Sequence, residues 1–352
     1  MIATPKFQAL IDQDVWTSLV GQIENGNVVK AHALSYVTGD AGVKIAAAMA
    51  LLPTTGGIVD ATGFANPQNL TGFTIRAGVH VVLGPGLYTM PAASPCITVN
   101  QGGKLSGLGV NNPGATTIKA FNGFNKDIIK CISTAGVGQW WHGGRVSDLR
   151  LDGNKANNTS GHGISVYGLA EVSTIARLNI NECAQGGLYF NGSQSGTGTV
   201  QNVTTNKNGV AGVWIDNFMS GLSMLAVGGD ENPITFKITN PNNGGGSIYI
   251  IDPKSEKFTG GPAFEISGGN APITLTLAGG NCLNSGAAED TLIRILSPGP
   301  SPVITIQGLI SSLNYPTIID DQRAGKQIVS TPITYHGLLT YNHPTYQDFV
   351  TV

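Results

Sequence analysis

The feature that most constrains the fold is an internal repeat in the second half of the chain. From residue 145 onward the sequence divides into units, and each unit contains two short segments of alternating apolar residues separated by turns rich in Gly and Asn. Such alternation is typical of short β-strands. The first segments read VSDLRLDGN, ARLNINEC, TVQNVTTNKN and GLSMLAVGGDEN, and the second have their first inward residue at Ile164, Leu188, Val213, Ile234, Phe264 and Ile293. A repeat of about 21 to 30 residues predicts a solenoid.

The solenoid is predicted to be all-β. The repeats lack helical periodicity, and the chain has 49 glycines in 352 residues, with only 11% charged residues. These properties favour a parallel β-helix, in which each coil adds one strand to each of about three sheets and neighbouring coils stack about 4.8 Å apart. Equivalent side chains then form ladders along the axis.

One helix is predicted, and it precedes the repeats. Asp40 can cap the segment AGVKIAAAMALL, so we expect a helix at about 40–52 that closes one end of the solenoid. Residues 1–36 are then an N-terminal extension, and residues 37–352 are the β-helix. The segment 333–352 ends after a strand-like run with no evident capping helix. We expect this C-terminal coil to stack on a partner and to mediate a homo-oligomer, because open sheet edges associate.

Several motifs resemble the pectate-lyase-like superfamily of right-handed parallel β-helices. They are GDAGVKIAAAMALLPTTGGIVDATGF, VHVVLGPGLYTM, CITVNQGGKLSGLG and LRLDGNKANNTSGHGISVYG. The resemblance covers roughly residues 37 to 240 with motifs and the remainder only by the period of the repeat. The resemblance implies a single-stranded, right-handed parallel β-helix of roughly ten coils with a short N-terminal capping helix. The superfamily includes polysaccharide lyases, glycoside hydrolases, epimerases, phage tailspikes and non-catalytic surface proteins, so the resemblance implies carbohydrates without choosing among these activities.

Composition argues against several other classes of function. The 19 Lys and Arg against 21 Asp and Glu leave no basic excess for nucleic acid, and no apolar run is long enough to span a membrane. The four cysteines are scattered without CxxC spacing, which argues against a zinc site, and Asp148, Asp152 and Glu182 are too few and too mixed with Arg for calcium, so we expect no metal. We also expect no cofactor, because the GxGxxG patterns lie in coil turns without a strand–helix context. No signal peptide is evident, and we expect an extracellular or virion-associated protein.

Alternation also predicts which residues of the second segments face outward. The first outward row is predicted to contain Ser165, Tyr189, Trp214, Thr235, Glu265 and Arg294, and the second Tyr167, Asn191, Asp216 and Lys237. Aromatic rings beside carboxylates and amides suit a sugar polymer, so Tyr167, Tyr189, Trp214 and Lys237 are candidate binding residues. Alternatively, these aromatic residues only cover the sheet, and Asp216 and Lys237 form an ordinary surface pair.

The first segments give another outward group. Their register places Asp148 against Arg177 and stacks Asp152, Asn181 and Asn206 at one turn. This stack is either a structural ladder of turn residues or part of a site. In the functional interpretation Asp152 or Glu182 acts as acid or base, while Arg150 or Arg177 binds an anionic sugar.

Three further residues are candidate catalytic groups. Asp216 and Glu265 lie in coils two apart, a separation near that of an inverting glycosidase. His162 lies in a Gly-His-Gly tripeptide, which polygalacturonase-type hydrolases also carry, although their upstream aspartate motifs are missing here. The alternative is that the tripeptide is an ordinary turn of the β-helix.

The loop 136–144, GVGQWWHGG, places Trp140 and Trp141 beside His142. Adjacent indoles are costly to expose, so they pack over the sheet, line a saccharide groove or fill a subunit interface.

Two hypotheses for function follow from the sequence. In the first, the protein is a carbohydrate-active β-helix that binds a polysaccharide and cleaves it as a lyase or a glycoside hydrolase. In the second, it is a non-catalytic structural or adhesive β-helix, such as a tailspike body or a self-associating surface protein. The aromatic and acidic rows favour the first, whereas the low charge and missing catalytic motifs favour the second.

Overall fold

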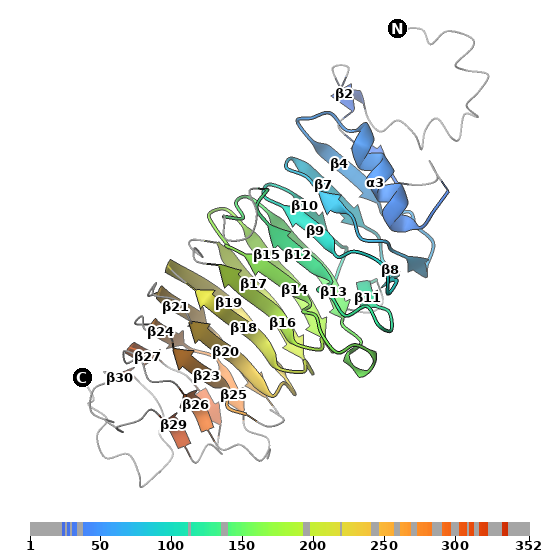
Figure 1. Cartoon of the computed structure of the whole chain (residues 1–352). Helices are drawn as coiled ribbons and strands as arrows, with labels where there is room; N and C mark the ends of the chain where they lie inside the picture. The colour runs from blue at the N-terminus through green and yellow to red at the C-terminus, as the bar shows by residue number, and fades with distance from the viewer. Residues whose placement is uncertain are drawn as a thin grey trace, which may run out of the picture.

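The computed structural model shows an elongated solenoid, with helix α3 at the N-terminal end of its described part (Figure 1). The structure describes residues 23–24, 27–28, 30–33, 38–111, 114–134, 140–192, 198–218, 220–240, 246–256, 261–268, 273–283, 291–296, 303–307, 310–312, 317–322 and 333–336. The described part of the chain contains no helix long and apolar enough to cross a membrane.

Helix α3 (Ala41–Leu51) is the predicted capping helix. Asp40 is its N-cap, and the Oδ1 atom of Asp40 accepts a hydrogen bond from the Val43 amide at 3.1 Å. The Oδ2 atom of the same carboxylate accepts from the Thr71 amide at 2.9 Å and from its hydroxyl at 2.7 Å. One side chain therefore caps the helix and ties it to the first coils.

In the described part of the chain the first sheet has 18 strands, and all of its strand pairs are parallel. Before it, β1 (Ile23–Glu24) and β2 (Asn27–Val28) form an antiparallel pair. The strands of the first sheet are β3 (Lys30–His32), β4 (Gly57–Ala61), β5 (Gln68–Asn69), β7 (Val79–Leu83), β8 (Gly86–Met90), β10 (Lys104–Ser106), β11 (Thr116–Ala120), β13 (Arg145–Asp152), β15 (Thr174–Asn181), β17 (Thr199–Asn206), β19 (Ser220–Asp230), β21 (Gly246–Ile251), β22 (Lys254–Glu256), β24 (Ile273–Ala278), β25 (Asn281–Leu283), β27 (Val303–Gln307), β28 (Ile310–Ser312) and β30 (Ile333–His336).

The second sheet has ten strands, also parallel, and a short 3₁₀ helix (Lys155–Asn157) lies before β14. Together the described parts of the sheets make about eight turns, slightly fewer than the roughly ten coils expected. The strands of the second sheet are β6 (Thr74–Ile75), β9 (Ile97–Asn100), β12 (Ile129–Ile132), β14 (Ile164–Tyr167), β16 (Gly186–Gly192), β18 (Ala211–Phe218), β20 (Ile234–Asn240), β23 (Phe264–Gly268), β26 (Thr291–Ile295) and β29 (Thr317–Asp321).

A ladder of residues with a left-handed backbone conformation bends the first sheet into two faces. In β13 the bend is at Asp148, with φ of 62°, between one part of the strand that pairs with β10 and another that pairs with β11. Successive coils repeat this conformation at the same place, so the coil turns at one residue. The ladder contains Asp148, Arg177, Asn202, Ala226, Asp252 and Gly279.

The interior is filled by the predicted ladders of apolar side chains. Ile164 pairs with Leu188 and Leu188 with Val213, and all three are fully buried. Further along the axis the rings of Phe236 and Phe264 stack, with centroids 4.8 Å apart. Each such side chain contributes about 1.5–3 kcal/mol through burial.

A pair of buried asparagines shapes the turn from the first sheet to the second. The Oδ1 atom of Asn208 accepts from the Cys183 amide, and the Oδ1 atom of Asn232 accepts from both the amide and the side chain of Asn208, all at 3.0 Å. Asn232 in turn donates to the Thr205 carbonyl at 2.7 Å. These bonds satisfy backbone groups that the turn would otherwise leave buried and unpaired.

The predicted position of Thr235 is wrong, and so is the row assigned to Lys237. Trp214 pairs with Lys237, so Lys237 belongs to the first outward row, and Thr239 takes its place in the second. Thr235 is fully buried, and its hydroxyl contacts the Ser255 hydroxyl at 2.5 Å. It precedes the inward Phe236 at a bend where the equivalent residue is Gly212, and a Cβ on Gly212 would lie 2.4 Å from an interior hydroxyl.

Candidate functional site

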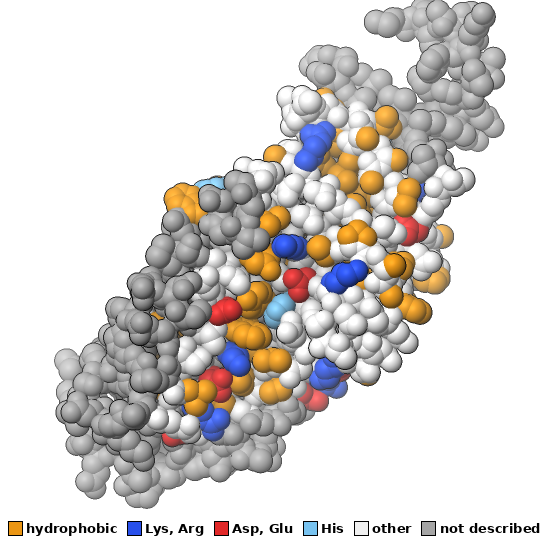
Figure 2. Space-filling view, in the orientation of Figure 1, with side chains coloured by type: hydrophobic (Ala, Val, Ile, Leu, Met, Phe, Trp, Pro, Cys, Tyr) orange, Lys and Arg blue, Asp and Glu red, His pale blue; other side chains and the backbone are white. Residues whose placement is uncertain are grey.

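The outer face of the second sheet collects aromatic and charged side chains along the solenoid axis. Figure 2 shows basic, acidic and histidine side chains set among hydrophobic ones on the broad face of the body. The registers of β12 to β29 align the first outward row as Lys130, Ser165, Tyr189, Trp214, Lys237, Glu265, Arg294 and Asp320. We call His162, Tyr189, Trp214, Asp216, Lys237 and Glu265 the central cluster.

His162 is held in place by backbone contacts and by a neighbouring ring. Its Nδ1 atom accepts a hydrogen bond from the Gly186 amide at 3.0 Å. Its ring stacks on Tyr189 with centroids 4.2 Å apart and planes at 8°, and it meets the edge of Trp214 at 5.9 Å. Because Nδ1 accepts, the neutral ring carries its proton on Nε2, which has no hydrogen-bond partner among the described residues.

Asp127 lies beside His162 and was not predicted. Its Oδ1 atom accepts from the His162 amide at 2.9 Å, and its Oδ2 atom accepts from the Ser165 hydroxyl at 2.5 Å. Asp127 precedes Ile129 by two residues, as His162 precedes Ile164, and those isoleucines pair. Extending the repeat alignment one coil toward the N-terminus would have found it.

Burial controls the protonation of His162. Desolvation lowers the pKa of His162 below its ordinary value of 6.5, and the Asp127 carboxylate opposes this shift by favouring the imidazolium. The net shift is downward, so the imidazole is neutral at neutral pH. A neutral imidazole protonated on Nε2 can donate a hydrogen bond to a ligand. It can accept a proton at Nε2 only in the tautomer protonated on Nδ1, which requires the ring to leave the Gly186 amide.

Asp216 is the centre of a hydroxyl network. Tyr189 donates to its Oδ2 atom at 2.8 Å, and Thr239 donates to its Oδ1 atom at 2.7 Å. Asn191 donates to the Tyr189 hydroxyl at 2.7 Å, and the Trp214 indole donates to Thr239 at 2.9 Å. Burial and, after it, the bond to Asp216 raise the pKa of Tyr189, so its phenol keeps its proton.

Lys237 joins the aromatic part of the cluster to its acidic part. Its ammonium lies 5.0 Å from the centroid of the Trp214 ring and 3.8 Å from a carboxylate oxygen of Glu265. Glu265 is only 8% exposed, so this pair is shielded from solvent on its acidic side. Asp216 and Glu265 lie two coils apart and in neighbouring outward rows, as predicted, whereas Lys237 lies in the row of Glu265 rather than in that of Asp216.

Tyr167 extends the face toward the N-terminal coils. It pairs with Asn191 in the second outward row, and the Lys130 ammonium lies 5.0 Å from the centroid of its ring. Burial raises the pKa of Tyr167, with a smaller contribution from Asp127. The structure therefore brings all four predicted binding residues of the second sheet, including Tyr189, Trp214 and Lys237, onto one face.

The other predicted acids and the predicted arginine lie on the first sheet. Arg177 pairs with Asp148 through two hydrogen bonds of 2.5 and 2.7 Å, which confirms the predicted contact. Glu182 lies 3.7 Å from the Lys155 ammonium. Asp152 stacks on Asn181, as predicted, and forms an ion pair with Lys119 at 3.1 Å.

The two neighbouring tryptophans have different environments. Trp141 is fully buried, and its indole donates to the Val99 carbonyl at 2.9 Å, so this side chain packs into the core rather than lining a saccharide groove. Trp140 is 42% exposed, and its ring centroid lies 5.2 Å from that of His142. Among the residues that the structure describes, no three His, Cys, Asp or Glu side chains are grouped so as to hold a metal ion.

The sequence matches no protein-family profile and no curated protein. Solved structures resemble it in fold. Tailspike protein 2 from an Escherichia coli O157:H7 bacteriophage is 13% identical, with a TM-score of 0.55 over 88% of this chain and 42% of that one. The enzymatically active domain of bacteriophage CBA120 tailspike protein 2 is 14% identical, with the same TM-score over 88% of this chain and 47% of that one.

A third structure, the mannuronan C-5 epimerase A-module of Azotobacter vinelandii, is 16% identical over 85% of this chain and 94% of that one, with a TM-score of 0.46. The chain spans less than half the length of the two tailspike structures. This likeness to the tailspike structures shows the fold alone, a right-handed parallel β-helix, as the sequence predicts.

Proposed function

We propose that this protein binds a polysaccharide along the outer face of the second sheet, with the central cluster as the main contact. The observation that carries the proposal is the alignment of rings, carboxylates and amides in rows parallel to the axis. Neighbouring strands lie about 4.8 Å apart, so the rows offer a regular, linear series of contacts. A linear polymer of sugars presents apolar ring faces and hydroxyls at regular intervals in the same way.

The hydrogen-bonding groups of the cluster suit sugar hydroxyls. Asp216 and Glu265 provide acceptors, whereas Lys237 and the Nε2 atom of His162 provide donors. Opposite charges alternate in the row from Lys237 to Asp320, which favours hydroxyls over a uniformly charged partner. The tailspike fold supports an extracellular or virion-associated setting for such binding.

Cleavage of the bound polymer is a second candidate function, favoured by the pairing of His162 with Tyr189. In the tautomer protonated on Nδ1, which requires the ring to leave the Gly186 amide, Nε2 of His162 can take a proton from a sugar carbon, and the Tyr189 phenol can give one to the leaving oxygen. Both groups lie on one face, with their rings in contact, and the Tyr189 hydroxyl is held by Asp216. This arrangement corresponds to elimination, the reaction of a polysaccharide lyase.

The test is to titrate the purified full chain with a panel of acidic and neutral polysaccharides by affinity electrophoresis. The same mixtures are assayed for unsaturated products and for new reducing ends. Retardation by at least one polysaccharide is the expected result, and unsaturated products would establish a lyase. Reducing ends without unsaturation would indicate a hydrolase. No retardation and no product across the panel would overturn the proposal in favour of a structural β-helix.

A further inference from the structure

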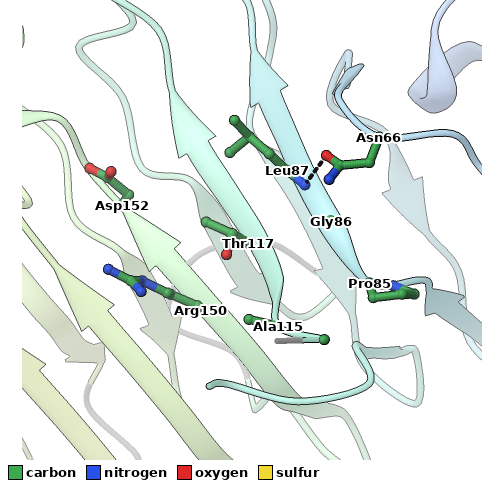
Figure 3. Close-up of a pocket in the computed structure, with 9 residues that line it drawn as sticks. Asn66, Pro85, Gly86, Leu87, Ala115, Thr117, Arg150 and Asp152 are labelled. Atoms are coloured by element: carbon green, nitrogen blue, oxygen red, sulfur yellow. Dashed lines mark hydrogen bonds between the residues drawn. The ribbon is translucent and has the colours of Figure 1, made fainter. Parts of the chain in front are cut away.

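A groove lies on the first sheet, on a different face from the central cluster. Its volume is about 520 Å³. Figure 3 shows that its lining residues come from successive strands, with Leu87 on β8, Thr117 on β11, and Arg150 and Asp152 on β13. The register aligns Leu87, Thr117 and Arg150 side by side across these three coils.

Arg150 provides an uncompensated positive charge in this groove. It is half-buried, and among the described residues it has no ion pair and no hydrogen bond. The neighbouring carboxylate of Asp152 is already engaged, because it pairs with Lys119 at 3.1 Å and accepts from the Asn154 amide at 2.9 Å. Arg150, Lys119 and Asp152 therefore leave a net positive charge at the groove.

The remaining lining residues combine polar donors with an apolar surface. The Oδ1 atom of Asn66 accepts from the Leu87 amide at 2.9 Å, as the dashed line in Figure 3 shows, which leaves its amide nitrogen as a donor. Thr117 adds a hydroxyl. Pro85, Leu87 and Ala115 supply apolar contacts beside these groups.

We propose that this groove binds the carboxylate-bearing unit of an acidic polysaccharide, as a site separate from the central cluster. The planar guanidinium of Arg150 matches a carboxylate through two parallel hydrogen bonds. Thr117 and Asn66 then bond ring hydroxyls, and the face of the pyranose ring lies against Leu87. An inorganic anion would satisfy Arg150 but leave the apolar part of the groove unused.

The experiment uses the full chain and a galacturonate trimer, titrated by calorimetry. The variant Trp214→Ala removes a central contact of the other face, so binding that remains in this background reports on the groove. We expect the trimer to bind this variant and the further change Arg150→Gln to weaken binding about tenfold or more. Arg145→Gln is the matched control, because Arg145 lies on the same strand but outside the groove, where it donates to the Ser147 hydroxyl at 3.0 Å, and the change should alter affinity less than about twofold.

Two more measurements test the chemistry of the site. Asp152→Asn should tighten binding of the trimer, because it removes a negative charge beside Arg150. A neutral galactose trimer should bind at least about tenfold more weakly than the galacturonate trimer.

Four outcomes would overturn the proposal: no binding in the Trp214→Ala background, unchanged affinity after Arg150→Gln, equal binding of the neutral trimer, or displacement by inorganic sulfate as effective as by free galacturonate. Thermal unfolding checks that Arg150→Gln folds, which we expect because the described structure gives this side chain no partner to lose. Failure of this proposal is distinguishable from failure of the proposed function. If the central cluster does not bind polysaccharide, Trp214→Ala leaves polysaccharide binding unchanged, whether or not Arg150→Gln weakens binding of the trimer.

Discussion

The imidazole of His162 lies face to face with the phenol ring of Tyr189, with centroids 4.2 Å apart and planes at 8°. The two residues belong to neighbouring coils, and the Gly186 amide that binds Nδ1 of His162 is on the strand that carries Tyr189. The stack therefore fixes the ring of His162 by contacts from the next coil. Its orientation on the outer face depends on the stacking register of the solenoid.

Replacing His162 should change how stability depends on pH. Because its folded-state pKa is lowered from 6.5, the unfolded chain takes up a proton first as the pH falls. Stability is then lost as the pH falls below about 6.5, and the loss levels off below the folded-state pKa. His162→Gln should flatten this slope in urea unfolding between about pH 5 and 7.5.

His80 contributes a slope of the same sign, since burial lowers the pKa of His80 as well. His162→Gln should therefore remove part of the pH dependence of the free energy of unfolding, and His80→Gln should remove another part. Parallel stability curves for the wild type and His162→Gln would contradict the prediction.

Asp127 should raise the pKa of His162, and this effect is separable from its hydrogen bonds. Asp127→Asn keeps an acceptor for the His162 amide but removes the negative charge, so the pKa of His162 should fall further. Ser165→Ala removes a hydrogen bond to Asp127 without changing its charge, and it serves as the control. Proton NMR titration of the imidazole measures the pKa of His162 in both variants. A rise in the pKa after Asp127→Asn would show that the carboxylate does not face the ring.

Trp214→Ala should weaken polysaccharide binding about tenfold or more, because a ring in the centre of a contact surface supplies much of the affinity. Tyr249→Ala is the matched control, since Tyr249 is an aromatic residue that is 37% exposed on β21 of the first sheet. Its loss should leave affinity nearly unchanged. Affinity electrophoresis compares the two variants, using the polysaccharides that retard the wild type. Equal losses of affinity in Trp214→Ala and Tyr249→Ala would place the binding surface elsewhere.

The neighbouring tryptophans should differ sharply in their contribution to stability. Trp141→Ala should lower the free energy of unfolding by about 3–5 kcal/mol, because the ring is buried and its indole would leave the Val99 carbonyl without a donor. The half-exposed Trp140→Ala should cost less than about 1 kcal/mol. Urea unfolding of the two variants tests the difference, and similar midpoints would mean that Trp141 is not in the core.

Ala226 should be one of the positions at which glycine stabilises the fold. Its φ of 52° costs an L-residue about 1–2 kcal/mol, which exceeds the entropy cost of glycine, so Ala226→Gly should raise the free energy of unfolding by about 0.5 kcal/mol. Ala176→Gly is the matched control, because Ala176 is fully buried within β15. That change should destabilise by about 1 kcal/mol. Destabilisation by both would argue against the left-handed bend.

The solenoid and most of its register could be predicted because each coil repeats a simple constraint. Alternation placed Ile164, Leu188 and Val213 inside, and these residues do pair in the core. The contact of Arg177 with Asp148 followed from the same register. The N-cap at Asp40 could be predicted because it depends only on the residues at the start of the helix.

The prediction fails where the sequence offers two equivalent choices. Ile234 and Phe236 are both apolar and lie two residues apart, so alternation alone does not distinguish them, and Phe236 is the residue that pairs with Val213. The parity of alternation also breaks at the bend before each strand, which is why His162 reaches the outer face although it precedes Ile164 by two residues. The separate environments of Trp140 and Trp141 depend on Gly144, where a Cβ would lie 2.2 Å from the buried indole.

The left-handed bend at Asp148, Arg177 and Asn202 makes the whole coil the natural unit of insertion or deletion. An added coil brings its own bend and keeps every neighbouring side chain on its original side, whereas one added residue within a strand exchanges inside and outside. The length of the face that contacts a polymer can therefore change in steps of about 4.8 Å while the packing of the interior stays the same. A footprint spread over several coils, such as that of His162 and Tyr189, is in contrast sensitive to which coils are adjacent.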